Sequence, residues 1–96
     1  MARDLHPTDG ARYLMERLGD SGEGARYRAT IFTPDAAFVA ELTLGRDGSV
    51  ELAPTGAPDE LHARLTSMAK LVARDAAKLA ADGMPAWPAR ILRWRR

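Results

Sequence analysis

The chain of 96 residues is long enough for one domain with a modest core, and the absence of cysteine excludes disulfides and thiolate sites. It has no run of about 18 apolar residues and no apolar stretch of the signal-peptide kind at its start, so we expect a soluble, cytoplasmic protein with no membrane segment.

The net charge of +1 conceals an uneven distribution. Residues 1–63 contain six arginines and eleven acidic residues, whereas residues 64–96 contain eight basic and two acidic residues. Two interpretations are open. Either the two halves attract each other within or between subunits, or the basic half meets an anionic partner.

Composition divides the chain into three parts. Residues 1–11 contain proline and glycine without a hydrophobic period, which indicates a loose leader. We expect one α+β domain over residues 12–83. Residues 84–96 form a basic tail that holds both tryptophans, and this tail is expected to pack on the domain or on a partner.

Residues 12–18 (RYLMERL) are ambiguous. Local propensity favours a short helix, whereas the following GDSGEG segment is typical of a hairpin loop and favours a strand. A strand could place Glu16 opposite Arg26, an opposite-charge pair that supports this register. We therefore favour the strand and keep the helix as the alternative.

The central segments 26–33 and 36–44 alternate in polarity around a tight connection at Pro34 and Asp35. One register places three apolar pairs on one face and an opposite-charge pair on the other. The pairs are Ile31 with Phe38, Ala29 with Ala40, Tyr27 with Leu42, and Arg28 with Glu41. The Asp47-Gly48 step then turns the chain into a further strand over residues 50–53, with Leu42 beside Leu52 and Leu44 beside Val50 on the same apolar face.

Residues 58–82 form the strongest pattern in the chain, an amphipathic helix with apolar residues three or four positions apart. Its expected inner stripe comprises Leu61, Leu65, Met68, Val72, Ala76 and Leu79, widened by Ala69 and Leu71. Pro58 suits the first turn, and Gly83 followed by Met84-Pro85 marks the end. At about 1.5 Å per residue this helix is as long as the domain, so its last turns either overhang or are covered by a second copy.

These elements predict an α+β fold in which an antiparallel meander of three or four strands (12–18, 26–33, 36–44 and 50–53) packs on the helix at 58–82. The outer face of the sheet mixes Leu14, Phe32 and Val39 with charged residues, so the tail could cover it. In an extended tail Arg90, Leu92 and Trp94 share one side, whereas a helical tail groups Trp87, Ile91 and Trp94.

No constellation of residues indicates a reaction. Asp59 and His62 have the spacing of two metal ligands on a helix, but a third ligand is missing nearby in sequence. The glycines at 19, 22 and 24 do not precede a helix as those of a phosphate loop must. We therefore expect no catalytic residue, no metal, no cofactor and no enzymatic activity.

The candidate partner surface is basic and aromatic. It comprises Lys70, Arg74 and Lys78 on the helix, with Trp87, Arg90, Arg93, Trp94 and Arg95 in the tail. The interpretation we favour is a small non-enzymatic module that acts through self-association, as a homodimer, or through an unknown protein partner. The alternative is nucleic-acid or anionic-surface binding, for which the isoelectric point of 8.2 is low.

Overall fold

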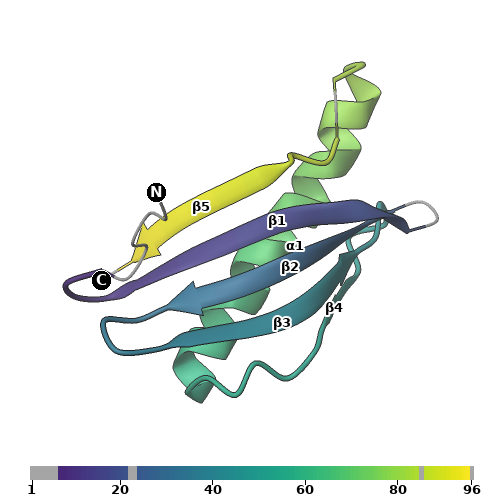
Figure 1. Cartoon of the computed structure of the whole chain (residues 1–96). Coiled ribbons are helices and arrows are strands. Elements are labelled where there is room, and N and C mark those ends of the chain that lie inside the picture. Colours follow the sequence, from purple (N-terminus) through teal and green to yellow (C-terminus); the bar gives the residue numbers. More distant parts are fainter. Residues whose placement is uncertain (1–6, 22–23, 85, 96) are drawn as a thin grey trace.

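The computed structural model describes residues 7–21, 24–84 and 86–95. These residues form β1 (Ala11–Ser21), β2 (Gly24–Phe32), β3 (Ala37–Leu44), β4 (Val50–Leu52), α1 (Asp59–Ala81) and β5 (Arg90–Arg95). The strands make one antiparallel sheet in the order β4-β3-β2-β1-β5, and α1 crosses one of its faces (Figure 1). The predicted α+β architecture is confirmed, with one more strand than expected because the tail joins the sheet as β5. Most of the predicted leader, residues 1–6, lies outside the described residues.

The strand interpretation of β1 is confirmed, but its register is not the expected one. Glu16 pairs with Arg28 rather than with Arg26. The prediction was wrong because the two strands continue to Ser21 and from Gly24, and because a β-bulge near the loop shifts the pairing by one residue. The resulting error of two residues preserves strand alternation, so the apolar side chains of β1 still face the helix.

The registers of β2 with β3 and of β3 with β4 are those predicted from the sequence. The pairs are Ile31 with Phe38, Ala29 with Ala40, Tyr27 with Leu42, Arg28 with Glu41, Leu42 with Leu52 and Leu44 with Val50. Tyr27, Ile31, Leu42 and Leu44 are fully buried on the helix side. Alternation and turn chemistry agree here, and this agreement fixes the central three strands.

The ends of α1 follow the capping signals, with a shift of one residue at each end. Pro58 is the N-cap rather than the first helical residue, and its carbonyl accepts the Leu61 N–H at 3.0 Å. At the other end Gly83 adopts a φ of 75°, which lets the Met84 N–H reach the Leu79 carbonyl at 2.8 Å. This bond closes a Schellman cap and ends the helix.

The fully buried side of α1 is narrower than the predicted stripe, and its side chains are shorter. The fully buried helix residues are Leu65, Ala69, Ala73 and Ala76. Three of the four are alanines, whose short side chains let the helix backbone approach the sheet. Leu71, which was expected to widen the stripe, is instead 49% exposed. The last turn of α1 extends past the edge of the sheet (Figure 1).

The segment between α1 and β5 is fastened to the helix side of the sheet. Trp87 is buried in the core, and the Tyr27 hydroxyl donates to the Pro88 carbonyl at 2.7 Å. Arg17 donates its backbone N–H to the Ala89 carbonyl at 2.9 Å and its Nη1 to the Trp87 carbonyl at 3.3 Å. Burial raises the pKa of the Tyr27 hydroxyl, and the Arg17 charge opposes that rise. These bonds direct the chain into β5 at the free edge of β1.

Candidate functional site

The structure distributes the predicted partner surface over three faces and the core. Lys70, Arg74 and Lys78 lie exposed on α1, Arg93 and Arg95 lie on the helix side of β5, Arg90 and Trp94 lie on the opposite side of the sheet, and Trp87 is buried. Neither tryptophan therefore shares a face with the basic row of the helix.

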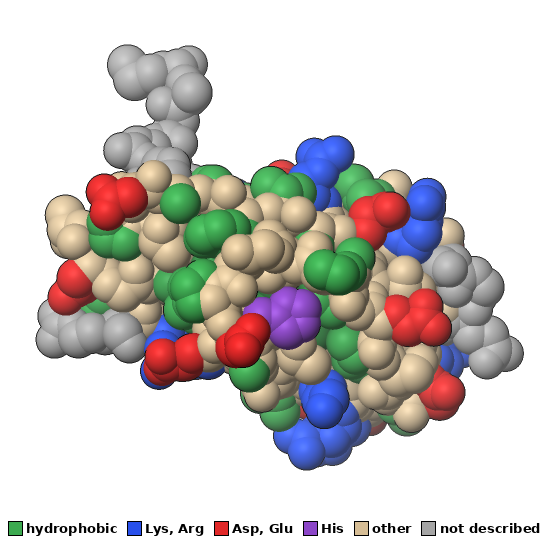
Figure 2. Space-filling view, turned by 90° about the horizontal axis from the view of Figure 1, so that it is seen from below, with side chains coloured by type: hydrophobic (Ala, Val, Ile, Leu, Met, Phe, Trp, Pro, Cys, Tyr) green, Lys and Arg blue, Asp and Glu red, His purple; other side chains and the backbone are tan. Residues whose placement is uncertain are grey.

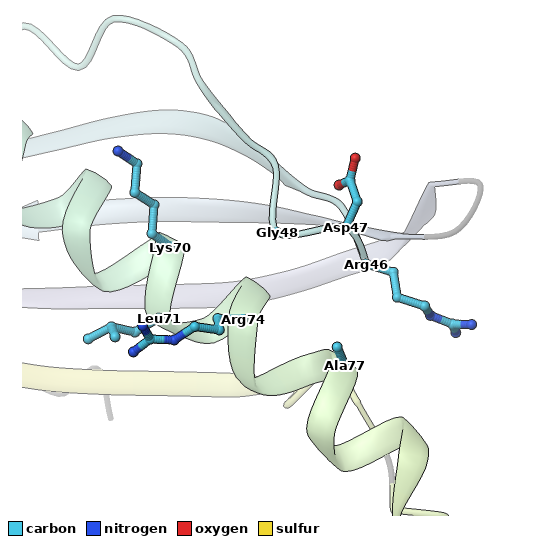
Figure 3. Close-up of a pocket in the computed structure, with 7 residues that line it drawn as sticks. All are labelled: Arg46, Asp47, Gly48, Lys70, Leu71, Arg74 and Ala77. Atoms are coloured by element: carbon cyan, nitrogen blue, oxygen red, sulfur yellow. The ribbon is translucent and has the colours of Figure 1, made fainter.

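The basic row of α1 borders a shallow hollow beneath the β3–β4 turn. Arg46, Lys70 and Arg74 line it, together with Asp47 and Leu71. In Figure 3 the three basic side chains point in different directions, and Arg46 points away from the helix. The Ser49 hydroxyl and backbone N–H hold the pKa of Asp47 below its usual value. Its carboxylate therefore adds a negative charge to a hollow lined by basic residues. The basic side chains that line the hollow therefore do not converge on one position where an anionic ligand could bind.

Figure 2 shows a histidine side chain at the molecular surface beside an acidic one. His62 lines the same shallow pocket as Asp59. Its Nδ1 is 3.2 Å from the Thr55 hydroxyl, a bond that ties the helix start to the preceding link. In the part of the chain that the structure describes, no three His, Cys, Asp or Glu residues gather as metal ligands. Within the same residues no helix is long and apolar enough to cross a membrane.

The side of the sheet away from α1 is covered by no described helix or strand (Figure 1). We call it the open face. Strand alternation and the observed registers place on it Arg12, Leu14, Glu16, Arg26, Arg28, Thr30, Phe32, Ala37, Val39, Glu41, Thr43, Glu51, Arg90, Leu92 and Trp94. It is therefore a sheet face without a packed layer in the described structure.

One half of the open face is mainly apolar, with Arg12 and Thr30 among its apolar residues. This apolar half comprises Leu14, Phe32, Ala37, Val39, Leu92 and Trp94, drawn from the four strands β5, β1, β2 and β3. Val39 is 56% exposed, Trp94 is 44% exposed and Leu92 is 37% exposed, whereas Leu14 between them is buried. The Trp94 Nε1–H donates to the Asp9 carbonyl at 3.1 Å, so the indole is held in place on the sheet. Exposed apolar side chains gathered on one face are typical of an interaction surface.

Beside the apolar half, four charged residues lie in a line across the strands. Arg90 pairs with Glu16, Glu16 with Arg28, and Arg28 with Glu41. This charged row alternates in sign from β5 to β3. Its four side chains form no ion pair within 4.0 Å among the described residues. Arg28, Glu41 and Arg90 are exposed and Glu16 is half-buried, so the row lies at the solvent side of the sheet.

Sequence reasoning identified Arg90 and Trp94 but missed the surface to which they belong. The alternation of Arg90, Leu92 and Trp94 was a usable signal for a strand, and the structure confirms that grouping. The neighbours of that strand were not readable, because β1 and β5 are separated by most of the chain.

Comparisons with protein-family models, with curated proteins and with solved structures found no match to this chain.

Proposed function

We propose that this protein is a non-enzymatic, cytoplasmic module that works by self-association, forming a homodimer through the open face. The observation that carries the proposal is the exposed apolar half on a sheet whose other side already has its helix. A two-layer fold leaves one face of its sheet in water, and that face is ordinarily polar. Here Val39, Leu92 and Trp94 remain accessible instead.

The charged row supports a second copy of this chain as the occupant of the open face. Its charges run positive, negative, positive, negative, so the row read from its other end has every sign inverted. A second copy whose charged row runs in the opposite direction therefore presents an acid to each base and a base to each acid. A two-fold interface requires such self-complementarity, whereas an unrelated partner has no reason to match it.

The area available suits a weak dimer. Four strands at a spacing of about 4.8 Å and four rows of side chains at about 6.7 Å cover roughly 500 Å² on each copy. Two copies would bury about 1,000 Å², near the lower limit for a specific interface. We therefore expect dissociation in the micromolar range or weaker rather than an obligate dimer.

Sedimentation equilibrium at increasing concentration tests the proposal. The mass should rise from one chain towards two as the concentration reaches about 100 μM. Val39→Glu places a charge in the apolar half and should leave a monomer with an unchanged helix and sheet signal in circular dichroism. Leu71→Glu is the matched control, since Leu71 is similarly exposed but lies on α1. A mass of one chain for the unmodified protein throughout would overturn the proposal.

The nucleic-acid alternative draws on the basic residues of the helix side, including Lys70, Arg74 and Arg95. Neither tryptophan supports it there, because Trp87 is buried and Trp94 lies on the open face. Stacking on aromatic rings is what normally adds affinity to a basic groove. A gel shift at low salt that weakens linearly with the logarithm of salt concentration, and is lost in Arg74→Ala, would favour this alternative.

A further inference from the structure

We infer that the two copies are related by a two-fold axis that runs parallel to the strands and passes between β1 and β2. Glu16 then pairs with Arg28 of the partner subunit, and Arg90 pairs with Glu41 of the partner subunit. This inference rests on the proposed self-association and specifies its geometry.

Packed sheets keep their strand directions within about 30° of each other, which leaves two directions for the axis in the interface plane. An axis perpendicular to the strands and lying on the charged row would place every residue opposite itself, so Arg28 would face Arg28 of the partner subunit. A perpendicular axis between the charged row and the neighbouring row of Leu92 would press the charged row onto the apolar half, and one between the two apolar rows would leave the charged row outside the contact. Like charges and unpaired charges against apolar groups are both costly.

An axis parallel to the strands can lie at several positions, and the alternation of charge selects one. On β1 it would place Glu16 opposite Glu16 of the partner subunit. Between β5 and β1 it would pair Arg90 with Glu16 of the partner subunit but leave β2 and β3 outside the contact. Between β1 and β2 it forms two different pairs, each made twice by symmetry.

The contacts within the apolar half also agree with this axis. The same rotation places Trp94 opposite Ala37 of the partner subunit and Leu92 opposite Val39 of the partner subunit. The largest side chain of the outer row therefore meets the smallest. Arg12 falls opposite Phe32 of the partner subunit, a contact in which a guanidinium can lie over an aromatic ring. Sheets pack well when large and small side chains interdigitate in this way.

The pair between Arg90 and Glu41 of the partner subunit offers a clean experiment, because Arg90 and Glu41 are three strands apart within one chain. Arg90→Glu and Glu41→Arg should each raise the dimer dissociation constant about tenfold by setting like charges against each other. The double variant R90E/E41R should recover the original value. Within one chain the double variant restores no charge pair, since it places an acid beside Glu16 and a base beside Arg28. Recovery would therefore come from the contact between the two copies.

The control is Arg93→Glu, which makes the same charge change on β5 but on the helix side. It should leave the dissociation constant within about twofold of the original. Dimerisation of the unmodified protein with no loss in Arg90→Glu, or no recovery in the double variant, would overturn the axis and leave the proposed self-association standing. A monomer at every concentration would overturn both.

Discussion

Leu65→Ala tests the core that α1 forms with the sheet. Leu65 is fully buried, and the substitution removes three carbon atoms from the centre of the helix–sheet contact. At about 0.8 kcal/mol per buried carbon group the transfer loss is about 2.4 kcal/mol, and the residual cavity adds about 1 kcal/mol. We expect the free energy of unfolding to fall by about 3 to 4 kcal/mol.

Leu71→Ala is the matched control. It makes the same chemical change in the same helix, so the difference in helix propensity cancels, but Leu71 is 49% exposed. Its loss should be about 1 kcal/mol or less.

Urea unfolding followed by circular dichroism measures both variants, at a concentration low enough that self-association does not contribute. Equal losses for Leu65→Ala and Leu71→Ala would refute the assignment of the buried side of α1. A loss near 3 kcal/mol at Leu71 alone would show that the helix is rotated relative to the sheet. The assay therefore tests the helix orientation as well as the size of the effect.

Three further predictions concern the sheet. The Tyr13 hydroxyl is buried with no hydrogen-bond partner among the described residues, so Tyr13→Phe should leave unfolding stability unchanged or raise it by up to about 2 kcal/mol; a loss would contradict this. Gly24→Ala would drive a Cβ into the Leu44 carbonyl oxygen and should cost about 1 to 3 kcal/mol in urea unfolding, whereas Gly19→Ala enters open space and should be neutral within about 0.5 kcal/mol. Burial raises the pKa of Tyr27 above its ordinary 10.0, so its contribution to stability is complete below about pH 10 and is lost as pH rises through the folded-state pKa. Tyr27→Phe should remove that part of the alkaline loss, and an unchanged pH profile would count against it.

The local elements of this protein were readable from short stretches of sequence. Gly83 and Met84-Pro85 predicted the end of α1, and alternation around Pro34 predicted the register of β2 with β3. In each case the residues that interact lie within a few positions of a turn, so turn chemistry and side-chain period specify the pairing together.

The sequence was less informative about β1. Alternation correctly put its apolar residues on the helix side, but the charge pair of Glu16 with Arg26 suggested the wrong register. Glu16 has an arginine available at either position, because Arg26 and Arg28 both point to the open face. The length of the strands and the bulge in β1 decided between them, and neither is encoded in a local pattern.

The sequence by itself determined the class of fold, the central hairpins and the apolar side of most elements, because these depend on period and on turn residues. The tertiary structure decided where the tail lies and therefore what the candidate surface is. β5 pairs Arg90 with Glu16, which lie more than seventy residues apart in the chain. A local hydrophobic period cannot predict such a contact. That pairing completes the alternating charged row and brings Trp94 and Leu92 beside Leu14, so the proposed interface exists only in the folded sheet.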